Sequence, residues 1–369
     1  MSKAAELANL IGNINAGGGS SNRNIFQNGA MNVSQRSVSE TGIGSGAVDT
    51  YKTLDRVGIA HGNTDGRLTM TQTADGPSGF ANCLKLACTT ADTSIAAGEY
   101  LQLKFKFEGQ DLQTIKKGTS DAVPLTVSFY VKGNGNATYM CELEDHDNSR
   151  NNQQQFAVTS SWNRVSLTFV ADTTGAFDDD NALSLSILFW LHAGSTYTGG
   201  TYTANTWTGS VSAANRAVGI SSFFSSTSNT FFLTGMQVEV GQNPTTFEHR
   251  SFGDELRRCQ RYFIRRTQTD GQYPGAIVGF TTTSNYFNGA CQFETEMRAA
   301  PSLTSSGSFR GHGSPDSTGE ATGTLTIQNA SPHSCRINGS GMSFSGTNGI
   351  VTLLHQSGSA GNLSFDAEL

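Results

Sequence analysis

The feature that most constrains the fold is a strict alternation of apolar and polar residues with a period of two. In YLQLKFKFE, residues 100–108, leucine and phenylalanine alternate with glutamine, lysine and glutamate. This period places the apolar side chains on one face of a β-strand. The pattern recurs in residues 125–133, 165–169, 182–193 and 231–241. In the last stretch we expect an inner face made of Phe232, Met236, Val238 and Val240.

Composition extends this pattern to the whole chain. Charged residues make up 15% of the 369 residues, against a usual quarter, and 42 glycines accompany many serines and threonines. Further strands are predicted near Leu68–Thr73, Cys83–Cys88 and Val218–Ser222. We therefore predict an all-β chain: a jelly-roll-like antiparallel β-sandwich over residues 23–250 and a smaller C-terminal β domain over residues 267–369.

The charge balance and the cysteines exclude several classes of protein. A net charge of −6 argues against a general nucleic-acid binder, which needs a basic surface to neutralise phosphates. The six cysteines form no CxxC pair and are expected to be reduced and partly buried, as in a protein made in the cytoplasm. The chain opens with no signal peptide and has no apolar run of about 18 residues. We expect a soluble protein with no membrane insertion.

Residues 1–22 are predicted to form an anchor helix followed by a Gly/Ser linker. In SKAAELANLIGNI, Leu7 and Ile11 lie four residues apart, and Ala8, Ile11 and Ile14 follow one another at spacings of three. These spacings place them on one face of a helix, which Ser2 can cap. So short a helix is marginal in water by itself, so its apolar face needs a partner. That partner is either the chain's own sandwich or another protein, including other copies of the chain.

A second short helix is predicted over residues 251–266, between the two β domains. Asp254 and Glu255 would lie in its first turn, and three arginines would lie in its later turns, which is the charge distribution that the helix dipole favours. The helix either packs as a plain linker on its own sandwich or stacks domains of different subunits around a threefold axis. The residues expected at this domain or subunit interface are Leu256, Arg258, Cys259, Arg261, Tyr262 and Phe263.

Motifs that carry catalysis or bind metals are not found in the sequence. The acidic stretch CELEDHDNSR could offer Asp145, Asp147 and Asn148 to a calcium ion, but the EF-hand spacing is missing. The histidines show no zinc spacing, and neither a GxSxG elbow nor a P-loop occurs. We expect no catalytic residue, no metal and no cofactor.

One polar stretch carries three large aromatic residues without an evident internal reason. In FWLHAGSTYTGGTYTANTWTG, residues 189–209, they are Tyr197, Tyr202 and Trp207. Aromatic rings stack on the flat faces of sugars, while amides and hydroxyls bind sugar hydroxyl groups. The three rings either cap one end of the sandwich or face a ligand, for which a glycan is the candidate, or a neighbouring subunit.

Two long motifs resemble a family of tail-fibre-like structural proteins of bacteriophages. RNIFQNGAMNVSQRSVS, residues 23–39, matches the opening N-x-x-x-N-G-x-M-x-x-x-Q-R of that family's β-sandwich. TFFLTGMQVEVGQNPTTFEHRSFGDELRRCQRYF, residues 230–263, matches its last strand and its exit motif F-E-x-R-x-x-x-x-E-L-x-x-C-Q-R-Y-F. Residues 279–301 resemble the family's small C-terminal domain, with Glu294-Thr295 in place of its usual apolar-Pro step.

The resemblance implies a virion protein, assembled in the host cytoplasm and forming a homotrimeric fibre or spike. Its N-terminal helix would attach to other proteins of the phage tail or head, and its β domains would meet a host-surface glycan or outer-membrane receptor without catalysis. Two other functions stay open. One is a purely structural virion component, such as a head fibre, tail-tip or adaptor protein, and the other is a polysaccharide depolymerase.

Overall fold

The computed structural model describes two compact units of the chain. It describes residues 2–15, 22–209, 211–268, 277–283, 286–307, 309–313, 317–321, 325–340, 351–356 and 361–369. The first unit comprises Met1–Leu256 and Leu369, and the second comprises Arg257–Glu368. The boundary lies inside helix α3 (Phe252–Gln260), which falls within the segment predicted as a helix between the two β domains.

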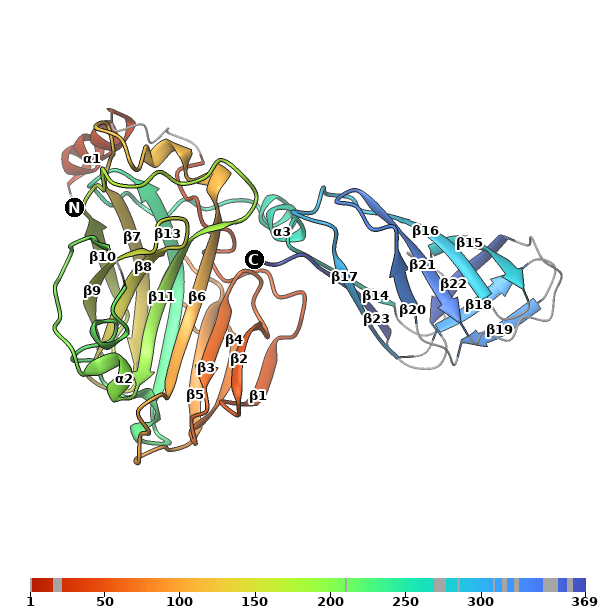
Figure 1. Cartoon of the computed structure of the whole chain (residues 1–369), viewed down its shortest axis with the longest axis horizontal. Coiled ribbons are helices and arrows are strands. Elements are labelled where there is room, and N and C mark those ends of the chain that lie inside the picture. The colour runs from red at the N-terminus through yellow and green to blue at the C-terminus, as the bar shows by residue number, and fades with distance from the viewer. Residues whose placement is uncertain are drawn as a thin grey trace. The chain divides into compact units, whose positions relative to one another are not determined.

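The first unit is built on two antiparallel sheets (Figure 1). The six-stranded sheet has the order β1 (Ser39–Ile43), β4 (Arg67–Thr73), β5 (Cys83–Thr90), β13 (Thr230–Val240), β7 (Leu125–Gly133) and β10 (Asn163–Phe169). The seven-stranded sheet has the order β12 (Thr208–Gly209), β9 (Arg150–Val158), β8 (Ala137–Asp145), β11 (Leu183–Ala193), β6 (Tyr100–Glu108), β3 (Gly58–Gly62) and β2 (Ala47–Tyr51).

The alternating residues build the core between these sheets. Phe105 of β6, Phe189 of β11 and Phe129 of β7 are fully buried, and their rings meet with centroids 4.7–5.2 Å apart. Since side chains of both sheets belong to one apolar cluster, the sheets pack face to face as a sandwich. The predicted all-β class and antiparallel β-sandwich are confirmed.

Strand β13 corrects one detail of the predicted face pattern. Phe231 and Leu233, rather than Phe232, join the core with Met236 and Val238. The pairing of β13 with β7 shifts its register between Thr234 and Gln237, and Gly235 in between has a φ of +62°. A β-bulge inserts one residue, so side chains before it point to the opposite face from the one a strict period predicts.

The segment Val218–Ser222 is a turn rather than the predicted strand. Gly219 has a φ of +76°, which interrupts an extended backbone. Only Ser221 N–H donates across to a strand, at 2.8 Å from the carbonyl of Thr138. Short 3₁₀ helices occupy other connections of this unit, at Gly109–Asp111, Gln113–Ile115, Ala213–Asn215 and Phe223–Ser225.

The second unit contains a three-stranded and a seven-stranded antiparallel sheet. The smaller sheet has the order β14 (Phe263–Gln268), β23 (Gly361–Asp366) and β17 (Ser302–Ser306). The larger has the order β19 (Ser317–Ala321), β18 (Phe309–Gly313), β22 (Val351–Gln356), β15 (Ile277–Thr283), β16 (Tyr286–Gln292), β21 (Ser334–Ser340) and β20 (Leu325–Gln328). Phe287, Ile337 and Phe365 are fully buried in its separate core.

Three α-helices are present in the described residues: α1 (Lys3–Asn15), α2 (Ser195–Thr198) and α3 (Phe252–Gln260). Ser2 caps α1, since its Oγ accepts from Ala5 N–H at 3.3 Å, and Ser251 likewise accepts from Asp254 N–H at 3.2 Å. Helix α3 is shorter than the predicted 251–266, because a turn from Cys259 to Tyr262 leads directly into β14. Within the described part of the chain, no helix has the length and apolarity to span a membrane.

All six cysteines are buried.

Candidate functional site

The outer face of the seven-stranded sheet in the first unit carries polar side chains that are nevertheless buried. Glu142 of β8 lies opposite Gln153 of β9, and Glu144 lies opposite Asn151. Glu142 is fully buried, and Asn151 and Gln153 are each 5% exposed. Buried polar groups need partners, so a covering segment must supply them.

That cover is the segment of residues 194–217, described except for residue 210, which we call the β9 loop. It starts at Gly194, forms α2, pairs with β9 through the two residues of β12, and ends after a 3₁₀ turn. Asn205 N–H donates to the Gln153 carbonyl at 2.9 Å. Thr201 N–H donates to Oδ1 of Asn215 at 2.9 Å, so the two limbs of the loop are joined.

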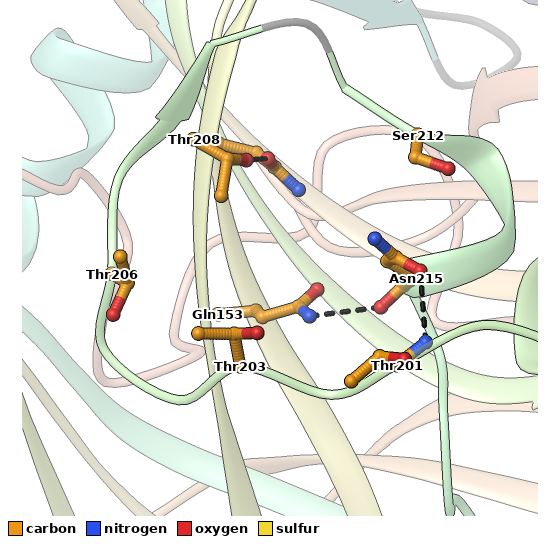
Figure 2. Close-up of a pocket in the computed structure, with 8 residues that line it drawn as sticks. Gln153, Thr201, Thr203, Thr206, Thr208, Ser212 and Asn215 are labelled. Atoms are coloured by element: carbon orange, nitrogen blue, oxygen red, sulfur yellow. Dashed lines mark hydrogen bonds between the residues drawn. The ribbon is translucent and has the colours of Figure 1, made fainter.

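The β9 loop and β9 enclose a polar cavity of about 60 Å³. Figure 2 shows the loop arching around the Gln153 amide, whose Nε2 donates to the Asn215 carbonyl at 2.8 Å. Gln153 Oε1 is buried and has no hydrogen-bond partner. The described residues that line it carry uncharged amides and hydroxyls: Asn151, Gln153, Thr201, Thr203, Thr206, Thr208, Ser212 and Asn215.

The buried carboxylate of Glu142 fixes the positions of the residues at the base of this cavity. Glu142 accepts from Trp190 Nε1 at 2.6 Å, Asn151 Nδ2 at 2.9 Å and Arg216 Nε at 3.0 Å. Arg216 also pairs with Glu144, at 2.8 Å. Burial by itself would lower the pKa of Arg216, but these two carboxylates outweigh it and raise that pKa, so the guanidinium stays charged. The pair fixes the end of the β9 loop to β8.

The network reaches the cavity through Asn151. Its Nδ2 is bonded to Glu142, and its Oδ1 accepts from the hydroxyl of Thr208. The orientation of this amide is therefore set on both sides. Glu142 and Glu144 both pair with Arg216, and the arrangement can hold hydroxyl groups through fixed donors and acceptors.

The three predicted aromatic residues all lie in the β9 loop, and each is half-buried with a structural partner. Tyr197 packs on Tyr100 and Trp190, with ring centroids 5.6 and 5.1 Å apart. The Tyr202 hydroxyl accepts from Gln155 N–H at 3.0 Å. Trp207 donates to the Val170 carbonyl at 2.8 Å and packs against the main core. These contacts hold the three rings against their own unit, and contact with a glycan stays a prediction.

The predicted anchor residues lie on α1. Leu7 and Ile11 are 58% and 49% exposed, and Ala8 is also exposed. The side chain of Ile14 lies outside the described residues. The same helix borders a cavity of about 400 Å³ with Arg23 and residues 244–246. Leu7 borders this cavity as well, so Leu7 and Ile11 form an apolar stripe that stays partly exposed beside the helix's own unit.

The predicted interface residues around α3 are mostly buried within the single chain. Cys259, Tyr262 and Phe263 are 0%, 1% and 4% exposed, and the Tyr262 carbonyl accepts from Ala367 N–H at 2.8 Å. This burial favours packing inside the chain over contact with a second copy. The remaining residues, Leu256, Arg258 and Arg261, are half-buried.

The acidic loop considered for calcium has protein partners instead. Asp145 is fully buried, and its Oδ2 lies 2.6 Å from Nζ of Lys117. Asn148 Nδ2 donates to the same carboxylate at 3.0 Å, and Asp147 accepts from Asp178 N–H at 3.0 Å. The lysine ammonium already occupies the position that a cation would take beside Asp145.

Sequence reasoning missed the residues that form the cavity. Gln153 and Asn151 belong to RNNQQQFAV, where five consecutive amides replace the usual alternation within a strand. Such a run is costly to bury without partners, so it was the one signal that a polar cover or ligand lies over this strand.

Comparisons with known proteins add similarities of fold only. No family model matches the chain, and no curated protein is similar to it at a significant level. Among solved structures it is similar to a CBM4 structure, with 12% identity and a TM-score of 0.30 over 58% of this chain and 99% of that one. It is also similar to the enzymatically active domain of tailspike protein 4 of bacteriophage CBA120, with 12% identity and a TM-score of 0.29 over 59% of this chain and 21% of that one.

A third similar structure is the family 11 carbohydrate-binding module from Clostridium thermocellum in complex with a mixed-linked tetrasaccharide. It has 14% identity and a TM-score of 0.27 over 56% of this chain and 99% of that one. The structural neighbours thus include carbohydrate-binding modules and a phage tailspike domain. At these identities and TM-scores the similarities carry no argument, so a function has to be argued from the site itself.

Proposed function

We propose that this chain recognises a carbohydrate without catalysis, at the surface of a bacteriophage particle, through the cavity under the β9 loop. The observation that carries the proposal is the unpaired, buried Oε1 of Gln153 in a cavity lined only by uncharged amides and hydroxyls. An unpaired buried acceptor costs about 1–3 kcal/mol, which a donor from a ligand would recover.

The chemistry of the lining selects the ligand class. A sugar hydroxyl can donate to Gln153 Oε1 while it accepts from a threonine hydroxyl, which matches the dual character of both groups. Because none of the described lining residues is charged, a neutral sugar fits better than a phosphate or carboxylate. A volume of about 60 Å³ corresponds to roughly two water molecules. The cavity therefore takes one substituent or ring edge, and the rest of the saccharide lies outside.

A contact this small binds weakly, so several copies on one particle would be needed. This requirement agrees with the tail-fibre-like motifs at residues 23–39 and 230–263 and with the exposed apolar stripe of α1, which suits attachment to other virion proteins. The proposed protein is a tail fibre or spike, a homotrimer anchored by its N-terminus. Its partner on the host is a surface glycan.

The test of the site uses the full chain coupled to beads, so that many copies meet an array of bacterial surface polysaccharides. Wild type should bind at least one neutral glycan. Gln153→Met and Thr203→Val keep the shape of the side chain and remove hydrogen-bonding groups, so each should reduce binding at least fivefold. Gln153→Met also removes the bond to the Asn215 carbonyl and should lower Tm, whereas Thr203→Val should leave Tm little changed. Thr89→Val, at an exposed threonine on β5, is the matched control and should bind normally.

The site proposal fails if no glycan is bound, or if the Gln153 and Thr203 variants bind as wild type does. The particle role is tested separately, by adding free protein to cells before phage. A host-binding fibre reduces adsorption, whereas a purely structural virion component neither binds cells nor competes. Release of reducing ends from the polysaccharide, abolished by Glu144→Gln, would identify a depolymerase instead.

The homotrimer is tested by light scattering on the full-length chain. At micromolar concentration we expect the measured mass to be three times that of one chain. If α1 joins the copies, the double variant Leu7→Gln with Ile11→Gln should have a measured mass closer to that of the monomer. A stable monomer of the unmodified chain would contradict the trimer.

A further inference from the structure

Three buried side chains meet at one end of the sandwich, away from the lining of the polar cavity. Asp92 follows β5, Glu99 directly precedes β6, and His192 lies near the end of β11. They are 4%, 5% and 0% exposed, respectively. One ligand atom from each lies within 4.8 Å of the others, and no other such group of histidine, cysteine and acidic side chains occurs in the described residues.

Within this cluster, two buried atoms face each other without a hydrogen-bond partner. They are Oε2 of Glu99 and Nε2 of His192, 3.6 Å apart. The other ring nitrogen, Nδ1, lies 2.8 Å from the hydroxyl of Ser222. When Nδ1–H donates to Ser222, Nε2 presents a lone pair to a carboxylate oxygen. Two lone pairs that face each other in a buried space repel, so the geometry calls for a positive group between them.

We propose that a divalent first-row cation of the zinc class binds between Asp92, Glu99 and His192. One imidazole nitrogen and two carboxylate oxygens form a mixed N/O set of the kind that zinc accepts, whereas calcium prefers oxygen ligands alone. Two ligand atoms at about 2.1 Å from one tetrahedral ion lie roughly 3.4 Å apart, close to the distance between Glu99 and His192. Water fills the fourth position.

The surroundings hold these side chains in place as an outer coordination shell does. Ser222 orients the imidazole through Nδ1, which leaves Nε2 for the ion. Asp92 accepts from the Thr64 hydroxyl at 3.0 Å and from the N–H groups of Asp65 at 3.1 Å and Ser94 at 3.2 Å. These bonds fix the Asp92 carboxylate before any ion arrives.

The cluster is connected to the β9 loop through the backbone. Gly194 N–H donates to the Glu99 carbonyl at 2.8 Å, and Thr196 N–H donates to the Ala97 carbonyl at 2.9 Å. A cation at Glu99 would therefore fix the point from which the β9 loop starts. The cation site itself does not depend on the proposed recognition of a carbohydrate.

The test uses untagged full-length protein, freed of metal with EDTA and then dialysed. Titration with zinc chloride in a calorimeter should show one site per chain, and cobalt(II) should give the visible absorption of a tetrahedral complex. Zinc at a hundredfold excess over Kd should raise Tm by roughly 5 °C or more, and calcium should not.

The deciding variant is Glu99→Gln, which keeps the shape of the side chain. Its amide can donate to Nε2 of His192, so it should fold without metal at least as stably as metal-free wild type, while its zinc Kd rises at least tenfold. His192→Gln should lose the cobalt spectrum. His61→Gln, at another buried histidine of the same sheet, is the matched control and should keep both zinc response and cobalt spectrum.

The proposal is overturned if metal-free wild type binds none of zinc, cobalt and manganese, or if Glu99→Gln binds zinc as tightly as wild type. Stabilisation by Glu99→Gln without any cation binding to wild type would mean that a shared proton, and no metal ion, occupies the cluster. Because glycan binding is measured in a separate experiment, failure of one proposal leaves the other standing.

Discussion

Two buried acidic clusters on the seven-stranded sheet differ in what neutralises them. Glu142 is fully buried, and Arg216 supplies a guanidinium 3.0 Å away while Trp190 and Asn151 donate as well. Glu99 and His192 are 5% and 0% exposed, yet Oε2 of Glu99 and Nε2 of His192 face each other without a hydrogen-bond partner. Burying charge is tolerated where the chain provides the opposite charge. Where it does not, the missing charge points to a ligand.

The largest effect is expected from removing the cation that the chain provides. Arg216→Ala leaves Glu142 as an unpaired buried carboxylate and should lower the free energy of unfolding by about 3–5 kcal/mol. Urea denaturation measures it. Lys132→Ala is the control, because its ion pair with Asp75, at 2.9 Å, involves a half-exposed carboxylate and should contribute at most about 1 kcal/mol. Equal losses in the two variants would contradict the assignment.

A second substitution sharpens this result. Glu142→Gln in the Arg216→Ala background removes the stranded charge and keeps an oxygen that can accept from Trp190. The double variant should regain about 1–2 kcal/mol of the free energy of unfolding relative to Arg216→Ala. If it is instead less stable than Arg216→Ala, the arginine matters for its packing and not for its charge. Zinc should leave these differences unchanged.

A third buried group tests the same rule through pH, with a smaller effect. Burial alone would raise the pKa of Asp172, but hydrogen bonds from Arg150, Thr174 and Lys117 outweigh it and lower that pKa below its ordinary 3.8. The stabilisation is therefore fully present above about pH 4 and is lost as pH falls through the lowered pKa. Asp172→Asn should flatten this acid decline in unfolding free energy. An unchanged slope in Asp172→Asn would contradict the prediction.

The sheets could be predicted from the sequence because the alternation of apolar and polar residues along each strand shows which side chains face the core and which face away from it. Phe105 and Phe189 follow that period and are buried as expected. Phe232 does not, since the bulge at Gly235 depends on a positive φ that a count of alternating residues does not contain.

The functional residues were harder to predict because distant segments create them. Gln153 becomes part of a cavity only when a loop some fifty residues later folds over β9, although the run of amides around it was a visible sign. Asp92, Glu99 and His192 come together through the pairing of β6 with β11, so no spacing in the sequence reveals them. Tyr197, Tyr202 and Trp207 were reasonable candidates because three large aromatic residues are unusual in so polar a stretch, but their contacts in the structure are with other residues of the same unit.

Contact between the cavity under the β9 loop and a neutral saccharide can be followed directly by a TROSY NMR titration. The labelled full-length chain is titrated with a glycan identified on the array, and the side-chain amide signals are recorded. We expect the Gln153 and Asn151 amide signals to shift, while that of Gln237, buried with its own partners in the same unit, stays in place. Shifts confined to other residues, with Gln153 unmoved, would contradict it.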